Sequence, residues 1–323
     1  MTANNAVFLS AQDVQSLLTL DDCIAAVEHA FRLHGEGNAS PPAVLSMHAA
    51  DGAFHIKAGI LNLKRSYFAA KINGNFPENP TRSGLPTIQG VIALFDAANG
   101  SPLGLMDSRD ITAMRTAAAT AVAAKFLARR DAHTLALCGC GDQGRVQVHA
   151  LSRVRELRTV FTHDQHQQRA HNLAQQLARD LKIAVTPVDN LRAAVLKSDL
   201  CITCTTSQTP LLHKEDVAPG TFIAAVGADN PSKQELHPDL MAAAKIVVDV
   251  LDQCASMGDL HHALDAKAVT RASVHAGLGE IVAGKKPGRE SLDEITIFDS
   301  TGMALQDVAA AAMVFEKWQA PRL

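Results

Sequence analysis

The pattern of apolar and polar positions changes character near residue 111. Before it, short apolar runs are separated by clusters rich in Gly, Pro and Asn, which is typical of strands joined by turns. A helix is expected ahead of them, beginning near Leu20 and capped by Asp21. The strands are expected at 43–47, 54–58, 68–73 and 87–96. This part of the chain predicts a mostly antiparallel sheet with flanking helices.

After residue 111, apolar runs alternate with helical segments. Helices are expected at 112–129, 143–155, 166–180, 190–197 and 302–318, and strands at 134–138, 158–162, 183–187, 199–205, 221–226, 245–249 and 296–300. This alternation favours a parallel sheet wound on both faces. We therefore predict an α/β protein, with a Rossmann-type doubly wound parallel sheet over 116–299 and an α+β domain formed by 1–115 and 300–323.

Composition limits the kinds of partner that are plausible. The 323 residues suit two domains, and 47% apolar with 20% charged residues is ordinary for a globular protein. A net charge of −3 argues against nucleic acid or an anionic membrane as partner. No apolar run approaches the roughly 20 residues that cross a bilayer, and the N-terminus lacks the features of a signal peptide. We expect a cytoplasmic protein.

Two of the six cysteines, Cys201 and Cys204, have the spacing of a redox motif. They lie in the apolar run SDLCITCTTSQ, which predicts a buried strand, whereas a reactive thiol needs an exposed helix start or a nearby cation. Structural thiols are therefore favoured. Because the chain has no second CxxC pair, we predict no zinc site and no other metal.

A glycine turn follows the strand 134–138 directly. Gly139 permits a tight turn, Gly141 lets the backbone approach a pyrophosphate, and Gly144 allows the next helix to pack on the strand. The exposed amides at the helix start, including those of Asp142 and Gln143, suit phosphates. Strand, glycine turn and helix in this order predict a dinucleotide site.

Asp164 ends the next expected strand. A carboxylate there binds the ribose hydroxyls of NAD and repels the 2′-phosphate of NADP, so NAD is favoured. His163 and His166 weaken this preference, because protonated imidazoles tolerate a phosphate. The alternative is that Asp164 only caps the following helix.

Four charged residues stand in apolar or glycine-rich surroundings: Lys71, Arg115, Asp229 and Lys233. Buried charges are costly unless paired, so such contexts indicate a functional site. Plainer interpretations stay open: a strand-edge lysine, an ion pair on a helix face, and a turn cap before Pro231.

Several segments together resemble the ornithine cyclodeaminase/μ-crystallin family over nearly the whole chain. They are AAKINGNFPENPTRSGLPTIQGVIALFDAANGSPLGLMD, ITAMRTAAATAVAAKFLAR, VGADNPSKQEL, GLGEIVAGKKPGR and FDSTGMALQD. The family includes ornithine cyclodeaminases, archaeal-type alanine dehydrogenases and ketimine reductases. Its members use a nicotinamide cofactor to interconvert amino acids and imino acids.

The resemblance implies roles for particular residues. Lys71 would meet the substrate carboxylate or polarise the imine, and Arg115 would bind the carboxylate beside the nicotinamide. Asp229 would act as acid/base at the substrate nitrogen. The implied cofactor contacts are Thr87, Thr205, Val226, Lys233 and Ser300, although Ser300 is also explained as a strand-end hydroxyl. The first domain would bind substrate and form a homodimer.

One departure from the family concerns the substrate. Many members carry an arginine near the first strand of the sheet, but this chain has none between Arg32 and Arg65. We expect Lys57, on an apolar alternating strand, to replace it as a carboxylate ligand, with His55 on the same face; a solvated lysine is the alternative. No acidic residue stands where ornithine's distal ammonium would need one. A small or acidic imino acid is therefore favoured.

The leading functional hypothesis is an NAD(H)-dependent reductase or dehydrogenase that interconverts a small 2-imino acid and the amino acid. The alternative is a cyclodeaminase-type lyase, in which bound NAD is reduced and reoxidised without net redox. A non-catalytic nucleotide-binding protein is disfavoured because Lys71, Arg115 and Asp229 are all present.

Overall fold

The computed structural model describes residues 6–40 and 42–320. Residues 1–5, on which the expectation about a signal peptide partly rests, lie outside the described residues. The chain divides into two compact units, Met1–Arg115 with Met303–Leu323, and Thr116–Gly302. The chain passes from the first unit to the second after Arg115, as in the division expected from the sequence. It returns to the first unit at Met303, whereas the expected division placed this return at residue 300.

The first unit is built on a six-stranded sheet of order β1-β6-β5-β4-β3-β2. All neighbours pair antiparallel except β1 and β6. The four expected strands are confirmed as β2 to β5, and β6 was not expected because Pro102 and Gly104 interrupt its pattern. The bounds are β1 Val7–Leu9, β2 Ala43–Ala49, β3 Gly52–Asn62, β4 Ser66–Asn75, β5 Ile88–Asp96 and β6 Pro102–Asp107.

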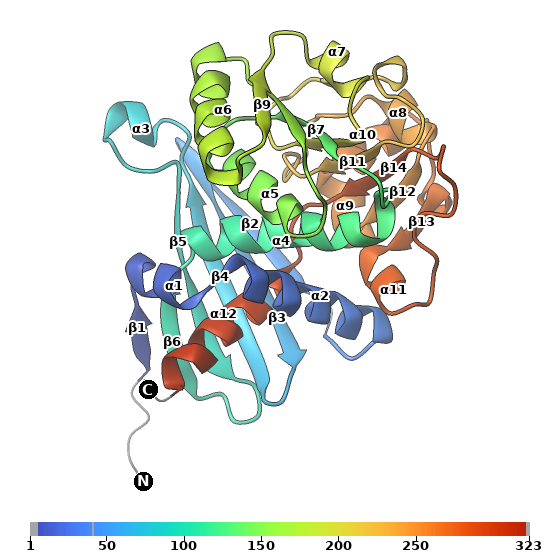
Figure 1. Ribbon diagram of the computed structural model, residues 1–323. Coiled ribbons are helices and arrows are strands. Elements are labelled where there is room, and N and C mark those ends of the chain that lie inside the picture. The colour runs from blue at the N-terminus through green and yellow to red at the C-terminus, as the bar shows by residue number, and fades with distance from the viewer. Residues whose placement is uncertain (1–5, 41, 321–323) are drawn as a thin grey trace. The chain divides into compact units, whose positions relative to one another are not determined.

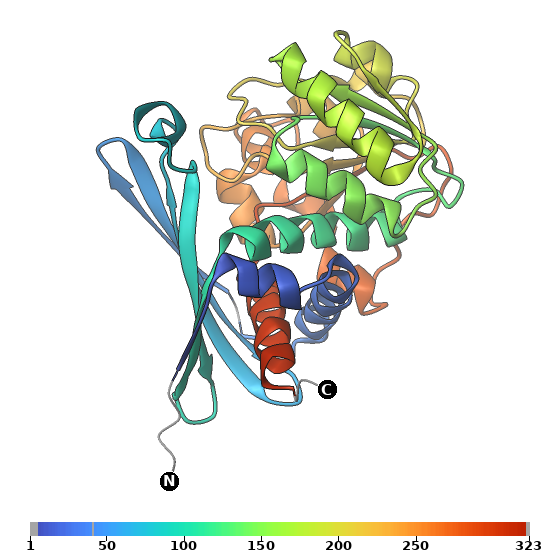
Figure 2. The ribbon, with the colours of Figure 1, turned by 60° about the vertical axis from the view of Figure 1, so that its left-hand side comes forward.

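Helices of the first unit cover one face of this sheet (Figure 2). They are α1 Ala11–Leu17, α2 Leu20–Glu36 and α12 Ala304–Gln319, with the short α3 Asn79–Arg82 between β4 and β5. The expectation that Asp21 caps α2 is wrong. Thr19 is the N-cap: its hydroxyl accepts the N–H of Asp22, while the Asp22 carboxylate accepts the N–H of Thr19. This reciprocal capping box satisfies two amides that one aspartate at 21 would not.

The strand register decides which side chains share the helix-covered face. Lys57 on β3 lies directly opposite Lys71 on β4, and Lys71 lies opposite Ile92 on β5. Because side chains alternate along a strand, Ile56 and Ile72 belong to the other face. The sheet therefore presents the two neighbouring lysines toward its helices and the two isoleucines on the opposite face.

The second unit contains an eight-stranded, wholly parallel sheet of order β13-β12-β14-β11-β10-β7-β8-β9 (Figure 1). The expected doubly wound Rossmann-type sheet is confirmed. Its strands are β7 Thr134–Cys138, β8 Thr159–His163, β9 Ala184–Pro187, β10 Leu200–Thr203, β11 Phe222–Ala225, β12 Lys245–Val248, β13 Val274–Gly277 and β14 Thr296–Asp299.

Helices lie on both faces of the parallel sheet. Four of them share one apolar core with the strands, whereas α5 and α6 pack on β7 and β8 from the other side (Figure 1). The short helices between residues 238 and 282 and strand β13 were not expected, because each spans too few residues to show a period, whereas the strand expected at 245–249 is confirmed as β12. The bounds are α5 Asp142–Ser152, α6 Gln167–Leu181, α7 Leu191–Val195, α8 Pro238–Ala242, α9 Leu251–Met257, α10 Asp259–Asp265 and α11 Leu278–Val282.

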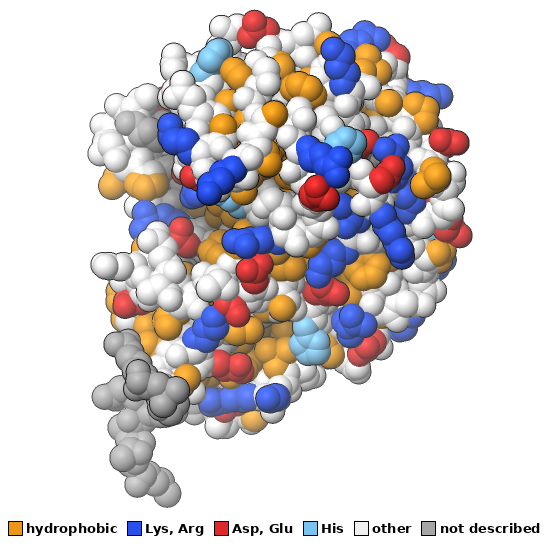
Figure 3. Space-filling model, viewed as in Figure 1, with side chains coloured by type: hydrophobic (Ala, Val, Ile, Leu, Met, Phe, Trp, Pro, Cys, Tyr) orange, Lys and Arg blue, Asp and Glu red, His pale blue; other side chains and the backbone are white. Residues whose placement is uncertain are grey.

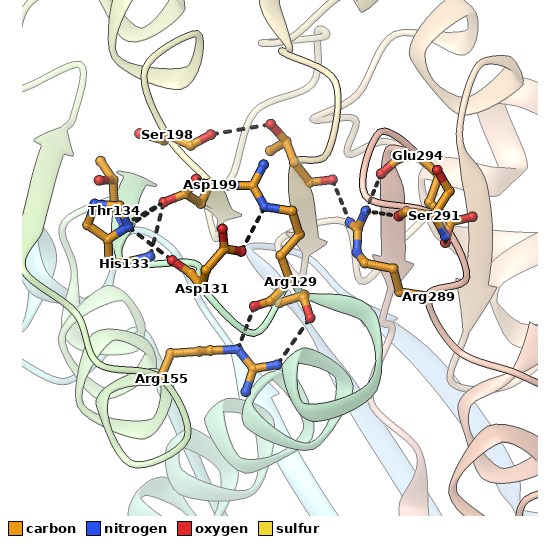
Figure 4. A network of polar contacts seen from close by, with 12 residues as sticks. Arg129, Asp131, His133, Thr134, Arg155, Ser198, Asp199, Arg289, Ser291 and Glu294 are labelled. Atoms are coloured by element: carbon orange, nitrogen blue, oxygen red, sulfur yellow. Dashed lines mark hydrogen bonds and ion pairs between the residues drawn. The ribbon is translucent and has the colours of Figure 1, made fainter.

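Helix α4, Arg109–Leu127, carries the chain from the first unit into the second. Guanidinium donors reach the carbonyls of its last turn: Arg155 donates to the Ala124 carbonyl, which also accepts the Ala128 N–H, and Arg289 donates to the Leu127 carbonyl. Figure 4 shows these arginines beside Arg129, whose guanidinium is 2.6 Å from Asp199. The C-terminal end of α4 is thus fixed in the second unit.

The expectation that Cys201 lies in a buried strand is confirmed, and Cys204 directly follows that strand. All six are free thiols. Cys201 is fully buried within β10, and burial raises the pKa of its thiol well above the ordinary value. Burial and nearby Asp164 raise the pKa of Cys140 to about 12. Neutral, enclosed thiols of this kind are poor nucleophiles.

Surface character is mixed. On the face shown in Figure 3, Lys and Arg side chains are interspersed with Asp and Glu. Among the described residues, no helix is both long enough and apolar enough to cross a membrane.

Candidate active site

The glycine turn after β7 has the conformation that a dinucleotide requires. Gly139 has φ +104°, a left-handed value that favours glycine. A Cβ at Gly144 would stand 2.1 Å from the Gly139 carbonyl oxygen, so α5 packs on the turn only without a side chain there. Gly141 is the N-cap of α5, and a Cβ built on it meets nothing within 4 Å. The helix start is open to a ligand.

A cavity of about 540 Å³ lies against this turn. Gly139, Gly141, Asp164, Thr205 and Ser207 are among the residues that line it. The structure thus brings Gly139, Gly141, the acid and Thr205 together around one space, while Gly144 packs behind the turn. Glycine amides, a carboxylate and hydroxyls are the groups that bind a pyrophosphate and ribose, so these residues fit a dinucleotide.

Asp164 is held by backbone amides at the ends of two strands. Its Oδ2 accepts the N–H of Cys140 and its Oδ1 accepts the N–H of His166, both at 2.9 Å. The N-cap of α6 is His166, not Asp164. A carboxylate has about four acceptor positions, so two still point to other donors.

Asp229 and Lys233 follow β11 and form an ion pair with 2.7 Å between Oδ1 and Nζ. The Asp229 side chain is 47% exposed, and that of Lys233 15%. Val226 directly follows the strand, and its N–H donates to the Thr203 carbonyl. The expected acid/base and the expected cofactor lysine are therefore partners of each other.

Two further expected cofactor contacts, Ser300 and Thr87, have hydrogen-bond partners within their own units. Ser300 is buried, and its hydroxyl donates to Asp249 Oδ2 at 3.0 Å. Thr87 belongs to the first unit and precedes β5, where its carbonyl accepts the N–H of Phe76. Within the second unit, Ser300 does not line the cavity beside the glycine turn, and neither do Val226 and Lys233.

In the first unit, Lys71 and Arg115 converge on one carboxylate. Lys71 Nζ and Arg115 Nε each lie 2.9 Å from Asp307 Oδ1, and Arg115 Nη1 donates to Gln306 Oε1 at 2.9 Å. All four residues are buried. Strand β4, helix α4 and helix α12 each supply one charged member of this cluster.

Burial controls the protonation of the cluster. Desolvation and the Arg115 charge lower the pKa of Lys71 to about 7, although Asp307 opposes the change. Burial favours the neutral form of Asp307, but Arg115 and Lys71 outweigh it and hold the pKa of that carboxyl below its ordinary value. Near neutral pH, the Lys71 ammonium is therefore close to losing its proton.

Lys57 adds a third cation to the same face. It lies directly opposite Lys71, and its charge acts on the pKa of both Lys71 and Asp307. His55 shares this face two residues earlier, with Nδ1 3.0 Å from Ser46 Oγ. Lys71 and Arg115 share a single carboxylate and have more N–H donors than Asp307 and Gln306 use. The cluster suits a further carboxylate.

Sequence reasoning missed Asp307 and Gln306. Both lie in ALQDVAAAA, an apolar stretch of α12. Asp307 is a charged residue among alanines, as Arg115 is, and this context was the available signal.

In the described part of the chain, one group of His and Asp side chains is close enough together to hold a metal ion. Ligand atoms of His213, His237 and Asp239 lie within 4.8 Å of one another. Local structure accounts for them, because the N–H of Asp239 donates to His237 Nδ1 at the start of α8. The absence of a metal stays a prediction.

Known proteins with a similar sequence and fold include enzymes that bind NAD. The sequence profile of the ornithine cyclodeaminase/mu-crystallin family matches residues 4–322, and the chain belongs to this family. An archaeal alanine dehydrogenase dimer with bound NAD is similar at a TM-score of 0.92 and 37% identity, over 97% of this chain and 95% of that one.

Two reductase structures are also similar. The Thermococcus litoralis Δ1-pyrroline-2-carboxylate reductase with NADH and L-proline has a TM-score of 0.91 and 32% identity, covering 96% of this chain and 97% of that one. The Paracoccus denitrificans iminosuccinate reductase with NAD⁺ has a TM-score of 0.89 and 32% identity, covering 97% and 96%.

Proposed function

We propose that the protein is an NAD(H)-dependent oxidoreductase that interconverts a small 2-imino acid and the corresponding amino acid. The observation that carries this is the buried pair of cations, Lys71 and Arg115, on the single carboxylate of Asp307, with the half-buried Lys57 directly opposite Lys71 on the sheet. Similar solved structures include an alanine dehydrogenase and reductases of two imino acids, which supports the same reaction class.

The second unit is the proposed NAD-binding domain. The turn from Gly139 to Gly144 would hold the pyrophosphate, and Asp164 the ribose hydroxyls of NAD in preference to NADP. When bound, the nicotinamide supplies or accepts the hydride. Three similar structures contain NAD or NADH, in keeping with this choice.

The cations of the first unit are the proposed carboxylate ligands. Arg115 offers a planar fork that pairs with a carboxylate through two N–H donors. Lys71 binds the same group or polarises the imine while it is protonated. Lys57 adds charge, which suits a small imino acid with one carboxylate or a second acidic group.

Asp229 is the proposed acid/base at the substrate nitrogen. In the reductive direction the nitrogen gains a proton as hydride reaches carbon, and a positioned carboxyl group can supply it. The ion pair with Lys233 orients the Asp229 side chain. Asp229→Asn should lower kcat while NADH still binds.

The experiment is to follow NADH absorbance during turnover. The protein is supplied with NADH and pyruvate, oxaloacetate or a cyclic 2-imino acid, with ammonia added to the oxo acids. We expect stoichiometric NADH consumption and amino-acid formation. Ammonia release from ornithine with no net change in NADH would instead identify a cyclodeaminase-type lyase. Parallel thermal-shift assays with NAD and NADP test the cofactor preference.

We also propose a homodimer formed through the open face of the antiparallel sheet. Leu45, Met47, Phe54 and Ile72 share that face, and their exposed fractions are 54%, 57%, 43% and 39%. A contiguous apolar patch of this kind marks an interface, and a similar archaeal enzyme is a dimer. A Leu45→Glu, Met47→Glu double variant should sediment as a monomer, whereas Lys64→Glu, on the β3–β4 turn, should not change the sedimentation.

A further inference from the structure

Glu235 is a fully buried carboxylate for which the proposed reaction has no use. Its Oε1 accepts the N–H and the hydroxyl of Thr205, at 2.6 and 2.8 Å. Its Oε2 accepts the Thr203 hydroxyl at 2.7 Å and the Gly227 N–H at 2.9 Å. One side chain therefore joins the end of β10 and the loop after it to the loop after β11.

The backbone beside Glu235 strengthens this connection. Gln234 N–H donates to the Ser207 carbonyl at 2.9 Å, and Leu211 N–H donates to the Glu235 carbonyl at 2.7 Å. Thr205 Oγ1 also accepts the Ser207 N–H. The loop from 205 to 211 supplies much of the wall of the 540 Å³ cavity beside the glycine turn. Glu235 thus fixes the wall of the proposed dinucleotide site from behind.

The loop after β11 also lies close to the Glu235 carboxylate. A Cβ at Gly227 would lie 2.4 Å from Glu235 Oε1 and 2.5 Å from the Thr205 carbonyl oxygen, so no side chain fits there. Gly227 in turn accepts the Asp229 N–H at 3.1 Å. The position of Glu235 therefore also determines where the Asp229 loop begins.

A further carboxylate holds Glu235 itself. Asp259 Oδ1 accepts the N–H groups of Glu235 and Leu236 at 2.7 and 2.8 Å, and Asp299 accepts the Leu260 N–H at 2.9 Å. These aspartates are fully buried, and burial together with the Glu235 charge raises the pKa of Asp259 to about 7. Burying carboxylates costs free energy that an apolar core avoids, so packing alone does not explain the arrangement.

We propose that Glu235 is a positioning residue that locks the 205–211 loop and the Asp229 loop together and thereby sets the affinity for NADH. The proposal rests on the NAD-binding part of the proposed function. Without Glu235 both loops would have to be ordered when the dinucleotide binds, and that cost would subtract from the binding free energy.

Glu235→Gln tests the proposal with almost no change in shape. The glutamine amide can be placed in two orientations. In one its NH₂ group faces the N–H of Thr205, and in the other it faces the N–H of Gly227, so the hydrogen bond to one of the two loops is lost. We expect the Kd for NADH, from fluorescence titration without substrate, to rise at least tenfold at temperatures where circular dichroism shows a folded protein. Glu215→Gln, an exposed change in the same unit, should leave the Kd unchanged.

A second variant acts through Glu235 without lining the cavity. Thr203→Val removes only the hydroxyl bound to Oε2 and should weaken NADH binding by a smaller factor, so the test stands even if Glu235→Gln does not fold. In hydrogen exchange of the wild-type protein, peptides containing Thr205 and Gly227 should be protected without cofactor. In Glu235→Gln both should lose protection together.

The outcomes separate this proposal from the reaction. Unchanged NADH affinity in folded Glu235→Gln, or in Thr203→Val if that variant alone folds, overturns the positioning role. Wild-type protein that binds NADH but reduces no imino acid contradicts the proposed reaction and leaves the positioning role supported by the variants. Wild-type protein that binds no dinucleotide overturns both.

Discussion

Lys71 and Asp307 form a buried ion pair, with 2.9 Å between Nζ and Oδ1, across a sequence separation of 236 residues. Arg115 binds the same carboxylate oxygen, so Asp307 neutralises only one of two cations. Burial makes the partner charges interdependent, because each ammonium, guanidinium or carboxylate depends on the others for its ionised form. Protonation of Lys71 and the stability of the first unit should therefore change together.

Asp307→Asn should shift the pH dependence of activity. The pKa of Lys71 is about 7 and Asp307 raises it, so removing that charge lowers it further. As pH rises through the pKa of Lys71, the lysine loses the charge with which, in the proposed function, it binds the substrate carboxylate. We expect wild-type kcat/KM for the imino acid to fall above about pH 7, and the fall to begin at lower pH in the variant, because kcat/KM reports the free enzyme.

The same variant should lose about 3 kcal/mol of stability, since breaking a buried ion pair leaves an uncompensated charge. Urea unfolding measures the loss, with Glu156→Gln, an exposed carboxylate paired with Arg158, as control. An unshifted pH profile in a folded Asp307→Asn would show that Asp307 does not govern Lys71.

The sequence predicts those members of this cluster that stand out from their neighbours along the chain. Lys71 and Arg115 were found because charges among alanines and β-branched residues are rarely left unpaired. Their common partner was missed, because pairing between β4, α4 and α12 depends on tertiary packing that no local pattern encodes.

The same distinction holds for the fold. Strands β2 to β5 and the β7–glycine turn–α5 unit were predicted because alternation and strand–turn–helix order extend over enough residues to be recognised. The cap of α2 was assigned to Asp21 instead of Thr19 because both residue types favour that position, and only the reciprocal bond with Asp22 decides between them. Glu235 had no sequence signal, since its four donors come from the end of β10 and from two separate loops.

Lys57→Ala should raise KM for the imino acid, or lower kcat, by at least tenfold, while NADH affinity stays constant. It should also raise the pKa of Lys71, because Lys57 lowers it, and so move the alkaline fall in kcat/KM to higher pH. Lys57→Arg keeps the charge and should retain most activity. Wild-type kinetics in Lys57→Ala would exclude a carboxylate-binding role.

Arg115→Lys should reduce kcat/KM by about a hundredfold, roughly 2.8 kcal/mol at about 1.4 kcal/mol per factor of ten. The guanidinium donates to Asp307 through Nε and to Gln306 through Nη1, and its remaining N–H groups can face a substrate carboxylate. A single ammonium group cannot reach Asp307, Gln306 and a substrate at the same time. Steady-state kinetics measure the effect. Arg109→Lys, in the first turn of the same helix and bound to Asp107, is the matched control and should behave as wild type. Equal losses in both variants would point to helix stability instead of substrate binding.

Asp164→Asn should weaken NADH binding about tenfold and narrow the preference for NADH over NADPH. The aspartate spends two acceptor positions on the N–H groups of Cys140 and His166, and the other two suit the ribose hydroxyls. Asparagine has a single acceptor oxygen, so it loses at least one of these bonds, and it no longer repels a 2′-phosphate. Separate NADH and NADPH titrations give the ratio of dissociation constants, with Asp189→Asn at the end of β9 as control. If NADH binding weakens and the ratio does not change, Asp164 acts only by holding the glycine turn and another group sets the cofactor preference.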